Sequence, residues 1–401
     1  MRDGVTEYFE NFLTKETLFN DKSVLTGSYV PEEIKHRDEQ ISQIAKILAP
    51  CLRLDKPSNL FIYGKTGTGK TLTIKHVGTR LSIVAKEKSI PLRIIYINCK
   101  LKKIADTEYR LIAELARFFG KAIPPTGLPT DEVYNIFIKA LDIEEQTVLI
   151  ILDEIDQLVK KTGDNIIYNL TRINADLHKA KLSLIGVSND LMFANNLDPR
   201  VKSSLSEEEL VFPPYNALQI QDILYNRARN AFKPQTIEEG VIPKCAAYAA
   251  RDHGDARRAL ELLRVAAELA ERNNEQKVRM AHIDDAEDKI ERDRVIDAVK
   301  NQPKQFQLVL YAILLISQNR KESIFTGEVY ALYKELCAKT GLRPLTQRRV
   351  SDVLAELDMF GIITAKVISK GRFGRTREIS MSIAPTIEEK IKKILQEDLT
   401  I

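Results

Sequence analysis

The stretch that decides the fold is Gly64-Lys65-Thr66-Gly67-Thr68-Gly69-Lys70-Thr71. It has the G-x-x-x-x-G-K-[ST] spacing of a phosphate-binding loop, and it lies between an apolar run and a helical pattern, as that motif requires. The glycines allow the loop to fold tightly, so that backbone N–H groups point at phosphate oxygens. The motif predicts a nucleotide site in which Lys70 neutralises the β- and γ-phosphates and Thr71 ligates Mg²⁺. A chance glycine-rich turn is disfavoured by the flanking elements.

A second motif combines a buried strand with two acids. The apolar run 148–152 ends in Asp153 and Glu154. A carboxylate at the end of a buried strand can hold a metal ion, so we expect Asp153 to bind Mg²⁺. Glu154 is predicted to orient and polarise the attacking water, because phosphoryl transfer depends mainly on positioning. Two acids after a strand are common alone, but paired with the phosphate-binding loop they predict an ATPase.

Three further polar residues follow predicted strands or begin helices. Asn189 follows the apolar run 182–187 and is predicted to contact the γ-phosphate or the attacking water; the alternative is a turn or cap residue. Arg257 lies in a first helical turn behind Asp255, from where it can reach the γ-phosphate; the alternative is a surface arginine. Arg200 lies where an arginine finger toward a neighbouring subunit would be placed, or it is a surface residue.

The hydrophobic pattern predicts three domains. Buried apolar runs alternate with helical patterns up to residue 215, which is typical of a parallel α/β sheet covered on both faces. The stretch 216–300 is helical throughout, and 301–401 has three helices followed by two alternating strands, the order of a winged-helix domain. The expected strands cover 59–63, 93–97, 147–152, 182–187 and 209–212. The expected helices of the first domain include Pro31 to about Leu54, 106–119 and 131–141.

The charge of the chain is unevenly distributed. Its 401 residues carry a formal net charge of +4, yet 301–401 contain 16 basic and 11 acidic residues, whereas the first 300 contain 44 and 45. Most of the excess falls between 341 and 377. A basic block on a near-neutral body indicates a module that docks on a polyanion, the alternative being a solvated face.

The basic block has two predicted DNA-binding parts. A helix start with outward-facing polar side chains suits base edges and phosphates, and a basic hairpin tip suits a minor groove or the DNA backbone. The alternative is a winged helix used for protein contacts. The predicted DNA-binding residues are Thr346, Gln347, Arg348, Arg349, Lys370, Gly371, Arg372, Phe373 and Arg375.

Composition excludes several other classes of protein. With 44% hydrophobic residues, the chain can bury cores, which argues against wholesale disorder. The longest apolar run, 308–316, is too short to span a bilayer, and the N-terminal stretch lacks a secretory pattern. Four separated cysteines without a CxxC motif argue against a zinc module or a disulfide framework. We expect a cytoplasmic, nucleoid-associated protein with no membrane partner.

In this order, the motifs resemble the archaeal origin-recognition/cell-division-control replication initiators. The resemblance covers nearly the whole chain and rests on 124–130 (P-P-T-G-L-P-T), 197–204 (L-D-P-R-V-K-S-S), 212–215 (F-P-P-Y) and 254–260 (G-D-A-R-R-A-L). It implies an AAA+ P-loop domain, an α-helical lid domain and a C-terminal winged-helix domain, with ATP or ADP and Mg²⁺ as cofactors.

The resemblance also implies roles for individual residues. Asn189 would be sensor 1 and Arg257 sensor 2, with Arg258 as the adjacent candidate. Arg200 would be the interfacial arginine, although Ser204 stands where many relatives have a second arginine, which leaves its action in trans open. Tyr215 joins the predicted nucleotide contacts. Two segments are also implied: Pro31–Arg37 beside the adenine, and a helical insertion that touches DNA at Lys100–Phe119.

The implied function is initiation of DNA replication. A member of this family would recognise double-stranded origin DNA in an ATP-dependent manner and help to recruit the replicative MCM helicase. Because much of the predicted site would sense the γ-phosphate, we expect ATP hydrolysis to be slow and to act as a switch. A second initiator copy or paralogue is a further expected partner. Two alternatives stay open: a clamp-loader-type AAA+ subunit, which the basic hairpin disfavours, and a nucleotide-gated winged-helix regulator.

Overall fold

The computed structural model describes residues 16–100, 106–205, 207–251, 254–319, 324–369, 375–383 and 385–399. The chain divides into two compact units, the first extending to Ile283 and the second starting at Asp284. The first unit contains the predicted ATPase domain and most of the predicted lid, and the second contains the winged helix. The exact boundaries at 215 and 300 stay predictions.

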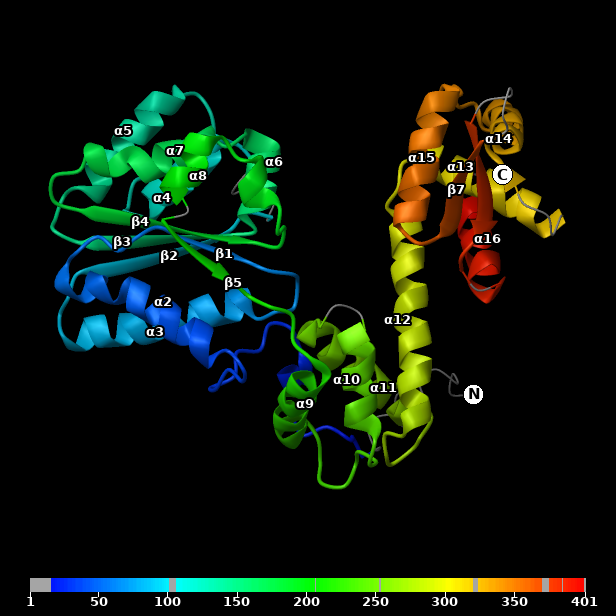
Figure 1. Ribbon diagram of the computed structural model, residues 1–401, viewed down its shortest axis with the longest axis horizontal. Coiled ribbons are helices and arrows are strands. Elements are labelled where there is room, and N and C mark those ends of the chain that lie inside the picture. The colour runs from blue at the N-terminus through cyan, green and yellow to red at the C-terminus, as the bar shows by residue number, and fades with distance from the viewer. Residues whose placement is uncertain are drawn as a thin grey trace, which may run out of the picture. The chain divides into compact units, whose positions relative to one another are not determined.

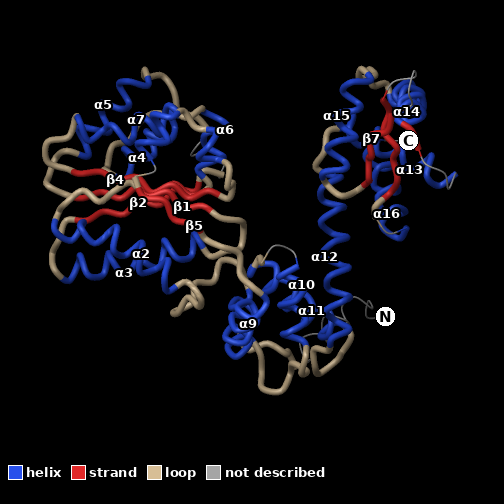
Figure 2. The backbone as a smooth tube through the Cα atoms, in the orientation of Figure 1, coloured by secondary structure: helices blue, strands red, loops and turns tan. Residues whose placement is uncertain are grey.

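A five-stranded sheet in the order β2-β3-β4-β1-β5 forms the centre of the first unit (Figures 1 and 2). All of its neighbouring strands run parallel. The predicted α/β parallel sheet is therefore confirmed, with ends that differ by no more than a residue or two from those expected. The strands are β1 (Leu60–Tyr63), β2 (Leu92–Asn98), β3 (Thr147–Asp153), β4 (Lys181–Ser188) and β5 (Glu208–Val211).

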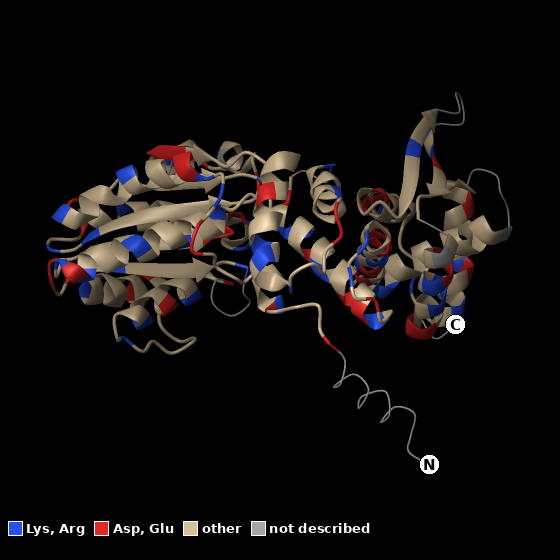
Figure 3. Cartoon of the chain, turned by 90° about the horizontal axis from the view of Figure 1, so that it is seen from below, with Lys and Arg blue, Asp and Glu red and all other residues tan. Residues whose placement is uncertain are grey.

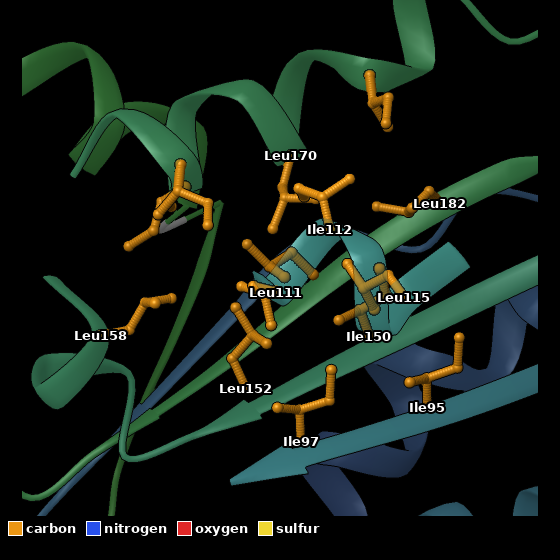
Figure 4. Packing of buried hydrophobic residues seen from close by; sticks show 14 of the residues in the cluster. Ile95, Ile97, Leu111, Ile112, Leu115, Ile150, Leu152, Leu158, Leu170 and Leu182 are labelled. Atoms are coloured by element: carbon orange, nitrogen blue, oxygen red, sulfur yellow. The ribbon is translucent and has the colours of Figure 1, made fainter. Parts of the chain in front are cut away.

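Helices cover both faces of the sheet, because its central strands are apolar on both sides. All residues of β3 are buried. On one face, Ile150 and Leu152 pack with Leu111 and Leu115 (Figure 4); the other face packs against α2 and α3. The covering helices are α2 (Asp38–Leu48) and α3 (Lys70–Glu87) on one side, and α4 (Glu108–Phe118), α5 (Thr130–Leu141), α6 (Ile155–Thr162), α7 (Asn165–Arg172) and α8 (Pro199–Leu205) on the other.

The helix expected from Pro31 is wrong at both ends. The α-helix begins only at Asp38, because His36 has a left-handed φ of 59° and Arg37 has non-helical angles. It ends at Leu48 and continues as a 3-10 turn, Ala49–Arg53, which contains Pro50. The residues before Asp38 are consequently free to follow an irregular path beside the phosphate-binding loop.

The helical part of the first unit forms the lid expected from the sequence. Two of its helices start at side-chain caps: Asn216 forms a capping box with Gln219, and Asp255 accepts two backbone N–H groups of the helix that follows it. An N-terminal segment that the sequence left unassigned belongs to this body, since Phe19 stacks on Phe232 with ring centroids 4.9 Å apart. The helices are α9 (Ala217–Ala231), α10 (Val241–Arg251), α11 (Ala256–Arg272) and α12 (Met280–Lys300), the last of which crosses into the second unit.

The second unit is a winged helix, as predicted. Its three-stranded antiparallel sheet has the order β6-β8-β7. Two of its elements were absent from the sequence prediction: the short strand β6, and α16, whose Ile391, Leu395 and Leu399 are buried in this core. The elements are α13 (Lys304–Asn319), β6 (Ile324–Phe325), α14 (Thr326–Thr340), α15 (Gln347–Met359), β7 (Ile363–Ser369), β8 (Arg375–Met381) and α16 (Pro385–Leu399).

None of the helices in the described ranges combines the length and apolar composition that crossing a membrane requires. In the view of Figure 3, basic and acidic residues are interspersed over the helices of the first unit. This mixing agrees with the near-zero charge of the first 300 residues.

Candidate functional site

The phosphate-binding loop joins β1 to α3 and is shaped by its glycines. Gly67 and Gly69 have φ angles of 68° and 89°, which favour glycine. The Lys70 ammonium lies beneath the loop and donates to the carbonyl oxygens of Gly64 and Lys65, each at 2.7 Å. Burial, followed by the charge of Arg257, lowers the pKa of Lys70 to about 8. The loop is thus built around a cation that a phosphate would satisfy.

The predicted magnesium ligands lie together. The Thr71 hydroxyl donates to Asp153 Oδ2 at 2.9 Å, and Asp153 is buried. The Tyr96 hydroxyl donates to the same oxygen at 2.5 Å, so the carboxylate is held from two sides. A hydroxyl beside a carboxylate is a hard oxygen donor set of the kind that Mg²⁺ takes at nucleotide sites. These residues therefore fit the ion that the sequence implies.

Glu154 leaves the strand through a left-handed residue. Its φ is 56°, a conformation that costs a non-glycine residue energy and that recurs at functional sites. Its carboxylate accepts from the Asn98 amide at 3.5 Å and lies 3.8 Å from the Lys100 ammonium. The turn separates the two acids, so that Asp153 faces Thr71 while Glu154 has different neighbours.

Two adjoining cavities of about 370 and 260 Å³ meet at the phosphate-binding loop. The 370 Å³ cavity is lined by Lys70, Asp153, Glu154 and Asn189, and it is suited to phosphates. The 260 Å³ cavity extends along 26–35 to Tyr215, Asn226 and Arg227, with more apolar walls suited to a base. Both are lined by Gly67, Gly69, Thr71 and Arg257. The structure thus brings the predicted sensor residues and the segment after Pro31 to one site.

The lid touches the phosphate-binding loop directly. The Ala256 amide at the start of α11 donates to the Gly67 carbonyl at 3.3 Å. Asp255 caps the same helix by accepting from the amides of Arg257 and Arg258 at 2.8 and 3.2 Å. A Cβ atom on Gly67 would lie 1.7 Å from Asp255 Oδ1. The helix that carries Arg257 is therefore placed by contact with the loop itself.

Some predicted residues do not line either cavity. Arg200 is exposed and pairs with Asp198 at 3.1 Å, so it takes no part in this chain's own site. Four residues of the phosphate-binding loop also line neither cavity. Within the loop, the Lys65 carbonyl accepts a hydrogen bond from the Thr68 hydroxyl at 2.8 Å. These four are Gly64, Lys65, Thr66 and Thr68.

Several residues of the site were not predicted from the sequence. Tyr96 and Asn98 lie two positions apart on β2, and Asn98 is in register with Asp153. Two polar side chains at alternate positions of one strand were the available signal in the sequence. This signal becomes informative only once β2 is known to pair with β3. Asp156, which is buried and accepts from the Ser188 hydroxyl at 3.1 Å, gave no signal.

The winged helix has a hollow of about 370 Å³ between α15 and the two strands of the hairpin. Arg348 and Arg377 line it, together with Thr326, Gln347, Ser351, Val367 and Thr376. Thr346 caps α15, and Arg349 forms an ion pair with Asp352 at 3.5 Å. The predicted tip residues Lys370, Gly371, Arg372 and Phe373 lie outside the described residues, and Arg375 begins β8.

The described part of Lys100–Phe119 contains α4, which buries Leu111, Ile112 and Leu115 in the sheet core. This helix therefore supports the ATPase fold. Its predicted contact with DNA stays a prediction.

Comparison with known proteins gives matches along the chain. Three family models match: an AAA domain over 53–191, a Cdc6 AAA+ ATPase-type lid domain over 221–288, and a CDC6 C-terminal winged-helix domain over 297–390. The ORC1-type DNA replication protein of Pyrococcus furiosus is 52% identical over 399 residues, which cover 98% of this chain and 94% of that protein. The ORC1-type DNA replication protein 1 of Methanosarcina mazei is 53% identical over 392 residues, covering 97% and 93%.

Among solved structures, the chain is similar to the Aeropyrum pernix ORC1 protein, which was determined in complex with DNA. The TM-score is 0.84 at 44% identity, and the match covers 96% of this chain and 98% of that one. The similarity therefore extends through both compact units.

Proposed function

The chain belongs to the ORC1-type family of DNA replication proteins, whose AAA+ domain is an ATPase, and we propose that it is a nucleotide-controlled initiator of replication. In this proposal it binds double-stranded origin DNA, helps to recruit the replicative MCM helicase, and hydrolyses ATP slowly. Nucleotide state acts as a switch and fast turnover is not required.

The residues of the site divide the work of ATP hydrolysis. Backbone N–H groups of the phosphate-binding loop and the Lys70 ammonium hold the β- and γ-phosphates. Thr71 and Asp153 would hold Mg²⁺, which when bound would neutralise charge on the phosphates. Glu154 orients the attacking water and accepts a proton from it. Asn189, which lines the same cavity, holds that water or the γ-phosphate.

One observation carries the proposed switch: the phosphate-binding loop is hydrogen-bonded to the lid. The Gly67 carbonyl accepts from Ala256, and Arg257, one residue further, lines both cavities. Loss of the γ-phosphate removes a partner from Arg257 and so changes the contacts that hold α11. Such differential contact is what allows a ligand to shift a conformational equilibrium.

The DNA-binding half of the proposal rests on the winged helix. Arg348 and Arg377 lie on one hollow, and no carboxylate pairs with either side chain within the described residues. Guanidinium groups form charge-assisted hydrogen bonds with DNA phosphates. The similar Aeropyrum pernix ORC1 structure contains DNA, which supports the same partner for this chain.

Arg200 extends the proposal to a second copy or paralogue. It is exposed, paired with Asp198, and outside the nucleotide cavity of its own chain, as an arginine acting on a neighbour's nucleotide must be.

Footprinting on chromosomal DNA tests the whole proposal. We expect a discrete protected site whose extent differs between ATP and ADP; the same non-specific coverage with both nucleotides would contradict it.

We predict that replacing Arg348 and Arg377 together by Ala weakens DNA binding. Each lost phosphate contact should flatten the slope of log K against log salt by about 0.9, so the double variant should lose roughly 2 from that slope. Binding is measured by fluorescence anisotropy between 50 and 200 mM salt, the range over which such contacts have large effects on affinity.

The matched control replaces Lys390 and Lys393 by Ala. Both lie exposed on α16, in the same unit and outside the hollow, and their loss removes the same charge. If both double variants reduce the slope equally, the hollow has no special role and the effect is general electrostatics.

A further inference from the structure

Arg37 is a buried cation next to the nucleotide site that no sequence motif assigned individually. It directly precedes α2, and only 2% of its surface is exposed. It lines neither nucleotide cavity. Its role must therefore be exerted through the groups that it contacts.

Those groups belong to two segments far apart in sequence. Arg37 Nε donates to the Thr68 carbonyl of the phosphate-binding loop at 2.9 Å, and Nη2 donates to the Pro213 carbonyl at 2.6 Å. The guanidinium carbon lies 3.8 Å from the centroid of the Tyr215 ring. Pro213 and Tyr215 belong to the linker between β5 and α9, through which the chain enters the lid.

The guanidinium has no acid partner in the described part of the chain. It donates hydrogen bonds to carbonyl oxygens, including that of His36. Burial lowers the pKa of Arg37, and the neighbouring Tyr215 partly offsets this lowering. Arginine stays charged in proteins, and a buried charge without a counter-ion is costly. A neutral side chain of similar size would avoid that cost. The shape of the guanidinium therefore matters more than its charge: a single planar group bridges two backbone segments and stacks on a ring.

Further contacts close a ring of segments around Arg37. A Cβ atom on Gly69 would lie 2.8 Å from the Tyr215 hydroxyl, so the linker packs on the phosphate-binding loop. A Cβ atom on Gly254 would lie 2.3 Å from the Tyr215 carbonyl, so the linker also packs on the residue before Asp255. Asp255 and its helix return to Gly67. Loop, linker and start of α11 are therefore packed against one another.

We propose that Arg37 is a positioning residue that transmits the nucleotide state of the phosphate-binding loop to the lid linker. It holds Thr68 and Pro213 at one guanidinium, so a change in the loop backbone displaces the linker and, through Tyr215, the start of α11. This inference rests on the proposed nucleotide switch and adds the element that couples its two halves.

The test is Arg37→Lys in the full-length protein. Lysine keeps the charge but cannot bridge two carbonyls in a fixed plane while stacking on Tyr215. Hydrogen exchange of segments 213–219 and 254–258 is compared with a non-hydrolysable ATP analogue and with ADP, both with Mg²⁺. For the wild type we expect a difference between the two nucleotides; in Arg37→Lys that difference should fall by about fivefold or more, the lower range of typical allosteric coupling. A stabilising residue without a coupling role would alter exchange equally with both nucleotides.

Arg80→Lys, an exposed change on α3, is the matched control and should keep the wild-type difference. If Arg37→Lys does not fold, Tyr215→Leu replaces it, since this variant removes the stacked ring and leaves the arginine bonds. A preserved difference in Arg37→Lys, or in Tyr215→Leu where that variant replaces it, overturns the inference and leaves the switch intact. No difference in the wild type overturns the proposed switch and the inference with it.

Discussion

Replacing Glu154 by Gln should lower the ATP turnover number by roughly 10²–10⁴-fold, the usual contribution of a positioned general base. ATP affinity should change little, because Lys70, Thr71 and Asp153 remain in place. The amide keeps the size of the side chain but cannot accept the proton of the attacking water. Steady-state phosphate release and equilibrium binding of a fluorescent ATP analogue measure the two quantities separately.

Glu144→Gln is the matched control, since this residue is exposed and does not line the cavities. Its turnover should equal that of the wild type. Undiminished hydrolysis in Glu154→Gln would show that Glu154 takes no part in the chemistry.

Glu154→Gln also separates the functional alternatives. A regulator that needs only nucleotide binding keeps its nucleotide-dependent DNA binding in this variant, whereas a hydrolytic switch remains in the ATP state.

Replacing Gly67 by Ala should weaken ATP binding and should lower the turnover number on the order of 100-fold, the loss in rate that a displacement of about 1 Å can cause. The new methyl group would lie 1.7 Å from Asp255 Oδ1 and 2.9 Å from Asp255 Cα. Rotation of the side chain relieves the first contact only, so the loop and the start of α11 must shift apart to relieve the second. Separation displaces Arg257 from the cavities that it lines. Isothermal titration with ATP and ADP, alongside thermal unfolding, measures the effect.

Gly120→Ala separates this clash from backbone strain. Gly120 has a similar φ of 76°, but nothing lies within 4 Å of the position that a Cβ atom would take there. It should lose only the roughly 1–2 kcal/mol of stability that a left-handed alanine costs and should bind ATP normally. Adding Asp255→Ala to Gly67→Ala should restore part of the affinity. Equal ATP affinities in the two glycine variants would show that the contact with the lid is unimportant.

The sequence was most informative where a chemical role requires adjacent residues. The phosphate-binding loop is one continuous stretch of sequence, and Asp153 and Glu154 are neighbours in another. Each motif could therefore be recognised from its own spacing, and together they predicted Thr71 and Asp153 as partners. The structure places the Thr71 hydroxyl 2.9 Å from Asp153 Oδ2. The helix from Pro31 was wrong because the periodicity of apolar residues does not report the left-handed angle at His36. The winged helix was recognised without α16, because its hydrophobic face becomes meaningful only against the core that it completes.

The sequence by itself determined the parallel sheet, the helical lid, the winged helix and the phosphate-binding loop, because local propensity and motif spacing are written along the chain. Tertiary structure alone decided how these parts cooperate. Arg37, Thr68 and Pro213 are separated by many residues, yet one guanidinium joins them. Tyr96 reaches Asp153 only because β2 pairs with β3. Such contacts depend on which backbones lie side by side, and that is settled by packing of the whole core.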